Sequence, residues 1–79
     1  MKVSVSYFAI LREQRGLTHE ELMTDVLTLR ELYLELKSRH SFSLTDNLVK
    51  AADRGQFVEM ESPLTEGAQV VFIPPVAGG

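Results

Sequence analysis

Apolar and polar residues alternate at the start of the chain, which predicts a β-strand with one mainly apolar face. The alternating residues are Val3, Val5 and Tyr7 on one face and Ser4, Ser6 and Phe8 on the other. Residues 9–15 are rich in good helix formers and are followed by Gly16, so about two helical turns are expected there. Residues 17–24 give a weaker strand pattern. Their acidic pair, Glu20 and Glu21, favours a sheet position with one solvated face.

The main helix is predicted to begin after Thr28. Thr28 and Glu31 have the spacing of a capping box, in which each side chain accepts a hydrogen bond from the backbone N–H of the other residue. The residues that follow repeat at i, i+3, i+4 and i+7 and give one apolar face, formed by Leu29, Leu32, Tyr33 and Leu36. Basic residues within positions 37–40 suit the negative end of the helix dipole. We expect this helix to lie across one face of the sheet.

The second half of the chain predicts short strands separated by turns. Residues 48–52 and 56–60 flank the turn sequence Asp53-Arg54-Gly55, in which glycine would supply a positive φ. Residues 68–73 form a last strand that is apolar on both faces, as expected of a central strand or of one that continues under a partner. The order of elements predicts an α+β fold for residues 1–73, in which a mixed sheet packs on one main helix.

A tail distinct from this domain is predicted for residues 74–79. It comprises Pro74, Pro75, Val76, Ala77, Gly78 and Gly79. The prolines fix φ and offer no N–H, so they should stop the last strand, and the glycines can enter a passage too narrow for a Cβ. Six extended residues reach roughly 20 Å. We expect a flexible tail whose functional group is the α-carboxylate of Gly79; the alternative is an idle terminus or a cloning remnant.

Composition indicates a small single domain and excludes several partners. The 79 residues, 44% hydrophobic and 24% charged, suit one globular domain. The net charge is −3 and the basic residues are scattered, which disfavours nucleic-acid binding. No apolar run approaches the roughly 20 residues needed to span a bilayer. Met1 and Lys2 lead directly into a strand pattern without a signal peptide, so a cytoplasmic location without a membrane partner is expected.

The chain contains no cysteine. This excludes disulfides, thiolate nucleophiles, persulfide carriers and cysteine metal sites, so any reactive sulfur would have to be attached to a carboxyl group. His19 and His40 lack the spacing of metal ligands, and no metal site is expected. The sequence has no glycine-rich phosphate loop and no nucleophile elbow. We therefore do not expect the chain to be catalytic alone.

Several large apolar residues predict a partner-binding face, because one helix cannot cover them all in so small a fold. They are Phe8, Phe57, Val71 and Ile73. Packing in the core is the alternative for each of them. Exposure of several together would favour the partner face.

Two parts of the chain resemble the small subunits of molybdopterin synthase. Residues 7–13, YFAILRE, are similar to the FFAxxRE signature of that family. Residues 62–67 and 71–79 resemble its C-terminal half, including the ending PPVxGG. Residues 17–50 match the family only in pattern. The combination of this start and this ending is more specific than either motif alone.

The resemblance implies a ubiquitin-like β-grasp fold and a role as a sulfur carrier in molybdenum cofactor biosynthesis. It implies that Gly79 is adenylated by a ubiquitin-activating-like adenylyltransferase that uses ATP, and is then converted to a thiocarboxylate by a sulfur donor protein. The tail would enter the large subunit of molybdopterin synthase, within a heterotetramer, and give its sulfur to a pterin precursor. The chain would be the sulfur-donating subunit of a sulfurtransferase complex, with no permanently bound cofactor.

Other functions remain open at this point. Arg54 stands where the family often has Asn, and Ala68 where it commonly has Asp, so a paralogue serving another pathway is an alternative. Such a paralogue would carry sulfur for thiamine, tRNA thiolation or cysteine synthesis. A ubiquitin-like modifier joined to lysines and a plain interaction module are the remaining alternatives.

Overall fold

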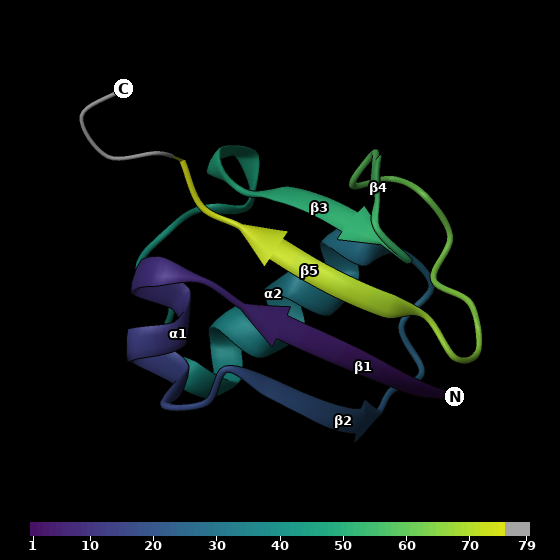
Figure 1. Ribbon diagram of the computed structural model, residues 1–79, viewed down its shortest axis with the longest axis horizontal. Helices are drawn as coiled ribbons and strands as arrows, with labels where there is room; N and C mark the ends of the chain where they lie inside the picture. The colour runs from purple at the N-terminus through teal and green to yellow at the C-terminus, as the bar shows by residue number, and fades with distance from the viewer. Residues whose placement is uncertain (76–79) are drawn as a thin grey trace.

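A five-stranded sheet forms one layer of the protein, and the main helix lies across one of its faces (Figure 1). The computed structural model describes residues 1–75. The strands are β1 (Lys2–Tyr7), β2 (His19–Met23), β3 (Lys50–Asp53), β4 (Gln56–Val58) and β5 (Gln69–Ile73). The helices are α1 (Ala9–Arg15), α2 (Leu29–His40) and the short 3-10 helix η1 (Asp46–Leu48). No helix in this described part of the chain is long and apolar enough to cross a membrane.

The strand β5 occupies the centre of the sheet, as its two apolar faces predicted. The order is β2-β1-β5-β3-β4, so β2 and β4 are the edges. β5 runs parallel to β1 and antiparallel to β3, which makes the sheet mixed. Both neighbours donate to and accept from its backbone, and neither of its edges faces water.

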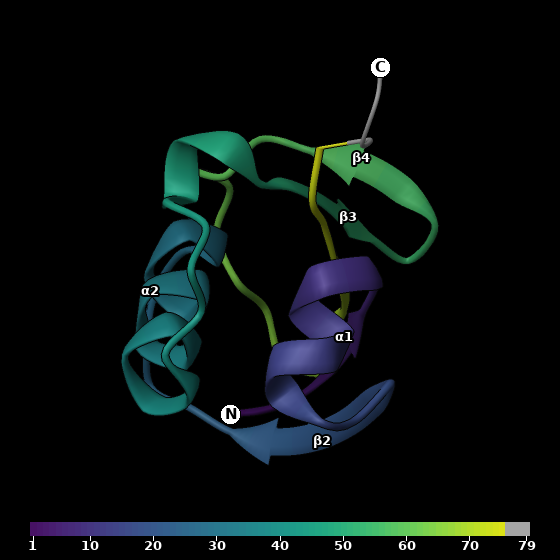
Figure 2. The ribbon, with the colours of Figure 1, turned by 90° about the vertical axis from the view of Figure 1, so that its left-hand side faces the viewer.

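The register divides the side chains of the sheet between two faces, because successive residues of a strand point in opposite directions. Val5 lies opposite Val70 and Tyr7 opposite Phe72, and all four side chains are buried beneath α2. The apolar stripe of α2 is buried against this inner face, as predicted. Figure 2 shows α2 held on one side of the curved sheet, so the other face of the sheet is left without a helix.

The main helix begins, and α1 ends, where local signals predicted. Thr28 accepts a hydrogen bond from the backbone N–H of Glu31, and Glu31 accepts one from that of Thr28, so the capping box is formed. Gly16, with φ 81°, ends α1 by donating its N–H to the Arg12 carbonyl. Ser41 ends α2 in the left-handed conformation, with φ 58°. No sequence signal predicted a serine in this position.

The strands of the second half are shorter than predicted. β3 begins at Lys50 because the preceding residues form η1, and β4 ends at Val58. Asp53 pairs directly with Gln56, which leaves a two-residue turn. Such a turn needs positive φ at both positions, and Arg54 (φ 50°) adopts it as well as Gly55 (φ 83°). The expectation that only the glycine would do so was wrong.

Candidate docking surface at the base of the tail

An apolar row crosses the uncovered face of the sheet. Phe57 lies opposite Ala52 in the β3–β4 pair, and Ala52 lies opposite Val71 in the β3–β5 pair. Phe57 is 78% exposed, whereas Ala52 beside it is buried and Val71 is half-buried. Beyond Val71 the row continues to Ser6, so the apolar character ends at β1. The row therefore places one protruding aromatic ring beside a shallow apolar surface.

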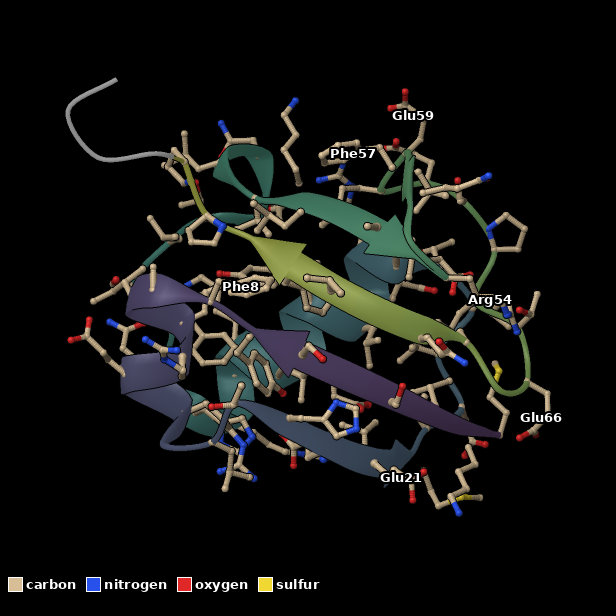
Figure 3. All side chains as sticks on the ribbon, viewed as in Figure 1. Phe8, Glu21, Arg54, Phe57, Glu59 and Glu66 are labelled. Carbon is tan, nitrogen blue, oxygen red and sulfur yellow. The ribbon has the colours of Figure 1, made fainter. Side chains whose placement is uncertain are left out.

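A second row lies closer to the tail and contains Ile73 and Phe8. Phe8 follows Tyr7 in extended conformation, so its side chain continues the alternation and turns to the uncovered face. Tyr7 pairs with Phe72, which places Phe8 beside Ile73. Phe8 is 49% exposed and lies at the tail end of β1, while Phe57 projects at the edge formed by β4 (Figure 3).

We call these residues the docking surface; they are Phe8, Ala52, Phe57, Val71 and Ile73. Four of them are the predicted partner-face residues, and the structure brings all four to one face. Ala52 was missed by the sequence analysis. An alanine pair in a strand places one alanine on each face, but only the register shows that Ala52 fills the gap between Phe57 and Val71. Exposed apolar patches of this kind are typical of protein-binding sites.

The tail leaves the sheet beside this docking surface. β5 ends at Ile73, directly before the proline pair that was expected to stop it. Pro74 is buried and Pro75 is exposed. The remaining residues predicted for the tail, Val76, Ala77, Gly78 and Gly79, lie outside the described residues. The predicted flexibility of the tail and the predicted role of Gly79 therefore remain predictions.

A buried polar cluster supports the segment that carries Phe8. The Tyr7 hydroxyl donates to Glu20 Oε2 at 2.7 Å, and Arg15 donates to both Glu20 oxygens at 2.8 Å. The hydrogen bonds from Arg15 lower the pKa of the Glu20 carboxyl, and burial raises the pKa of the Tyr7 phenol. Glu20 is thus a fixed anion and Tyr7 a fixed neutral donor. The cluster ties α1 and β2 to the end of β1.

The histidines take part in local contacts. His19 Nδ1 lies 3.0 Å from the Ser6 hydroxyl on the uncovered face. Burial, followed by the charge of Arg15, lowers the pKa of His40. Within residues 1–75, no group of three or more His, Cys, Asp or Glu side chains is placed to hold a metal ion.

Comparison with known proteins identifies the family. Residues 5–79 match the model of the ThiS family. The chain belongs to the ThiS family. The molybdopterin synthase sulfur carrier subunit of Escherichia coli (strain K12) is 35% identical over 80 residues, which cover 98% of this chain and 99% of that protein. The family resemblance found in the sequence is thereby confirmed.

Solved structures show the same fold over the whole length of this ThiS-family chain. One, provisionally described as molybdopterin converting factor subunit 1 from Pyrococcus furiosus, is 31% identical with a TM-score of 0.78, covering 96% of this chain and 99% of that one. Another is a complex of subunits 1 and 2 of molybdopterin-converting factor from Helicobacter pylori 26695. It is 22% identical with a TM-score of 0.68, covers all of both chains, and shows the fold alone. The predicted β-grasp fold is confirmed.

The two departures from the expected sequence lie outside the residues of the docking surface of this ThiS-family chain. Arg54 donates to the Asp53 carboxylate at 3.2 Å and to the Glu66 carbonyl at 3.4 Å, and so ties the β3–β4 turn to the turn before β5. Ala68, just before β5, is 1% exposed. Arg54 and Glu66 lie at the opposite end of the sheet from the tail (Figure 3).

Proposed function

We propose that this chain is the sulfur carrier subunit of molybdopterin synthase. Its C-terminal glycine, Gly79, is adenylated, converted to a thiocarboxylate, and donates its sulfur to a pterin precursor in molybdenum cofactor biosynthesis. The observation that carries this proposal is the docking surface at the point where the tail leaves the sheet. The full-length similarity to the Escherichia coli sulfur carrier subunit supports the choice of pathway.

The proposed chemistry explains why the chain needs other proteins. A carboxylate is a poor electrophile, so an ATP-dependent activating enzyme transfers AMP to the Gly79 carboxylate and releases pyrophosphate. Sulfide-level sulfur from a donor protein then attacks the acyl carbon of Gly79; the bond to AMP breaks, AMP leaves with its oxygen, a proton is released, and a thiocarboxylate remains. The chain supplies a narrow tail and a docking surface, and the enzymes supply the catalytic groups. No cofactor stays bound to the carrier.

In the proposed sulfur transfer, the docking surface positions the tail relative to the large subunit. Phe8 and Phe57 would enter recesses of the large subunit, and this contact fixes the sheet relative to the partner's active site. The tail then has only to span the distance from Ile73 to the reacting pterin, which is held within reach rather than encountered by diffusion. A heterotetramer of two carriers and two large subunits is the assembly expected from the family resemblance.

Sulfur loading tests the proposal directly. The protein is incubated with ATP, the activating enzyme and the sulfur donor of the same organism, and its intact mass is measured. We expect the mass change of one sulfur replacing one oxygen at Gly79, and no change in a matched variant lacking Gly79. That variant should still bind the large subunit, because the docking surface is intact. An unmodified wild-type mass would refute the proposal.

The protein that accepts sulfur from the loaded carrier distinguishes between the pathways. A purified large subunit of molybdopterin synthase should bind the protein and accept its sulfur, whereas a thiazole synthase should not. Transfer to the thiazole synthase instead would favour the thiamine alternative. Conjugates between Gly79 and lysines of other proteins in cell extracts would favour the modifier.

A further inference from the structure

One basic residue, Lys50, borders the docking surface on the uncovered face of the sheet. Lys50 lies directly opposite Ile73 in the β3–β5 pair, so its side chain shares the uncovered face. Its neighbour on the other side is Glu59, which follows the Ala51–Val58 pair of β3 and β4. Lys50, Phe57 and Glu59 border an open recess at this edge of the sheet.

Six of the eight basic residues form a side-chain ion pair or hydrogen bond within residues 1–75; Arg12, which lies on α1, and Lys50, which lies on the sheet, do not. Lys2, Arg15 and Arg30 all form ion pairs with carboxylates of the chain. Lys50 forms no ion pair and no side-chain hydrogen bond with any residue in the range 1–75, and it lies exposed. Its neighbour Glu59 has no ion pair in that range either. The ammonium group is therefore solvated until a partner covers it.

Docking would remove water from this ammonium group, because Lys50 lies beside Ile73 in the sheet and borders the same recess as Phe57. A desolvated charge without a counter-ion opposes binding, whereas one that meets a carboxylate favours it. Acidic side chains lie at the far end of the sheet: Glu21, which pairs with Ser4 and so shares the uncovered face, and Glu66, in the turn before β5 (Figure 3). An acidic residue of a partner would be repelled there and attracted at Lys50, so one lysine is enough to fix the position of the partner on the sheet.

We propose that Lys50 is a specificity-determining residue that pairs with a carboxylate side chain of the large subunit. This inference rests on the function proposed above. The partner then presents a mixed surface, with apolar recesses for Phe8 and Phe57 and one Asp or Glu facing Lys50. The pair sets the register in which the tail enters the large subunit. An apolar surface alone would allow the carrier to slide or rotate on its partner.

Titration of the large subunit with charge variants tests this pairing. Lys50→Gln should raise the dissociation constant about tenfold in low salt. The increase should be smaller at high salt, because salt screens the attraction that the substitution removes. Lys50→Arg should retain most of the affinity, and Lys50→Glu should lose more than Lys50→Gln. Lys2→Gln makes the same charge change at the far end of the sheet, where Lys2 pairs with Glu21, and should bind as the wild type does.

The variant Glu59→Gln decides between a partner carboxylate and an internal counter-ion. A partner carboxylate predicts that Glu59→Gln binds as tightly as the wild type or more tightly, because a repelling charge has been removed. Equal losses for Glu59→Gln, Lys50→Gln and the double variant would overturn the proposal, as would unchanged affinity of Lys50→Gln. Sulfur loading and binding by the wild type test the underlying function separately, since both would persist if only the role of Lys50 were wrong.

Discussion

At the scale of single residues, the Tyr7 hydroxyl explains an acidic strand that the sequence left uncertain. Tyr7 is fully buried, so its hydroxyl requires an acceptor. Glu20 supplies it from β2, and Arg15 neutralises that carboxylate from α1. The sequence predicted that Glu20 and Glu21 would point to opposite faces, and they do. It could not predict the cluster, because no local pattern links position 7 to position 20.

The Glu20 carboxylate should make the stability of the protein depend on pH in acid. Its pKa is below the usual 4.5 in the folded state, so its stabilising contribution is present above about pH 4.5 and is lost as pH falls through the folded pKa. Glu20→Gln should lower the unfolding free energy by about 1–2 kcal/mol at pH 7 and flatten its fall between about pH 5 and pH 3. Urea unfolding across this range measures both effects.

Arg15→Gln removes the main cause of the lowered pKa and should flatten the same part of the pH profile. An unchanged profile in both variants would show that the cluster does not contribute to folding. Tyr7→Phe provides a milder comparison, because the ion pair between Arg15 and Glu20 remains.

At the scale of the elements, helices were predicted more closely than strands, for a physical reason. The signals that begin and end α1 and α2 lie within a few residues of each boundary, as with Thr28 and Gly16. The limits of β3 and β4 depend on pairing with strands distant in the sequence, which no local pattern reports. The predicted central strand was the exception, because apolar residues on both faces of a strand are themselves a sequence pattern.

The end of α2 offers a test of helix termination. Ser41 holds φ 58° with its side chain exposed, a conformation that costs a residue with a Cβ about 1 kcal/mol and that glycine adopts freely. Ser41→Gly should therefore raise the unfolding free energy by up to about 1 kcal/mol, measured by chemical denaturation. Ser38→Gly, in the last turn of the same helix, should lower it by about 0.5–1 kcal/mol. Equal effects of both variants would contradict this account.

At the scale of the whole molecule, the sheet separates two kinds of surface. The tail leaves the sheet at one end of the docking surface, and Arg54 lies at the opposite end of the sheet from the tail. The sequence predicted Phe8, Phe57, Val71 and Ile73 as partner-binding residues because they are large and apolar. The positions of Ala52 and Lys50 beside these residues could not be predicted from the sequence, because only the strand register shows which side chains are neighbours.

Truncating Phe57 should separate binding from folding. Phe57 is 78% exposed, so Phe57→Ala should change the unfolding free energy by less than about 0.5 kcal/mol. Affinity for the large subunit, measured by calorimetry, should fall at least about tenfold, as expected when an aromatic anchor is removed. Leu27→Ala is the matched control, because Leu27 is 70% exposed but lies before α2, outside the docking surface. Equal affinities of the two variants would exclude Phe57 from the interface.

The central position of β5 has a mechanical consequence for the tail that follows it. A pull on the tail acts along β5, whose backbone is bonded to β1 on one side and to β3 on the other. The bonds of both ladders are then loaded together in shear, whereas a pull at right angles to an edge strand would open its bonds one after another. The sheet should therefore resist a load applied through Ile73 better than it would resist one applied at β2 or β4.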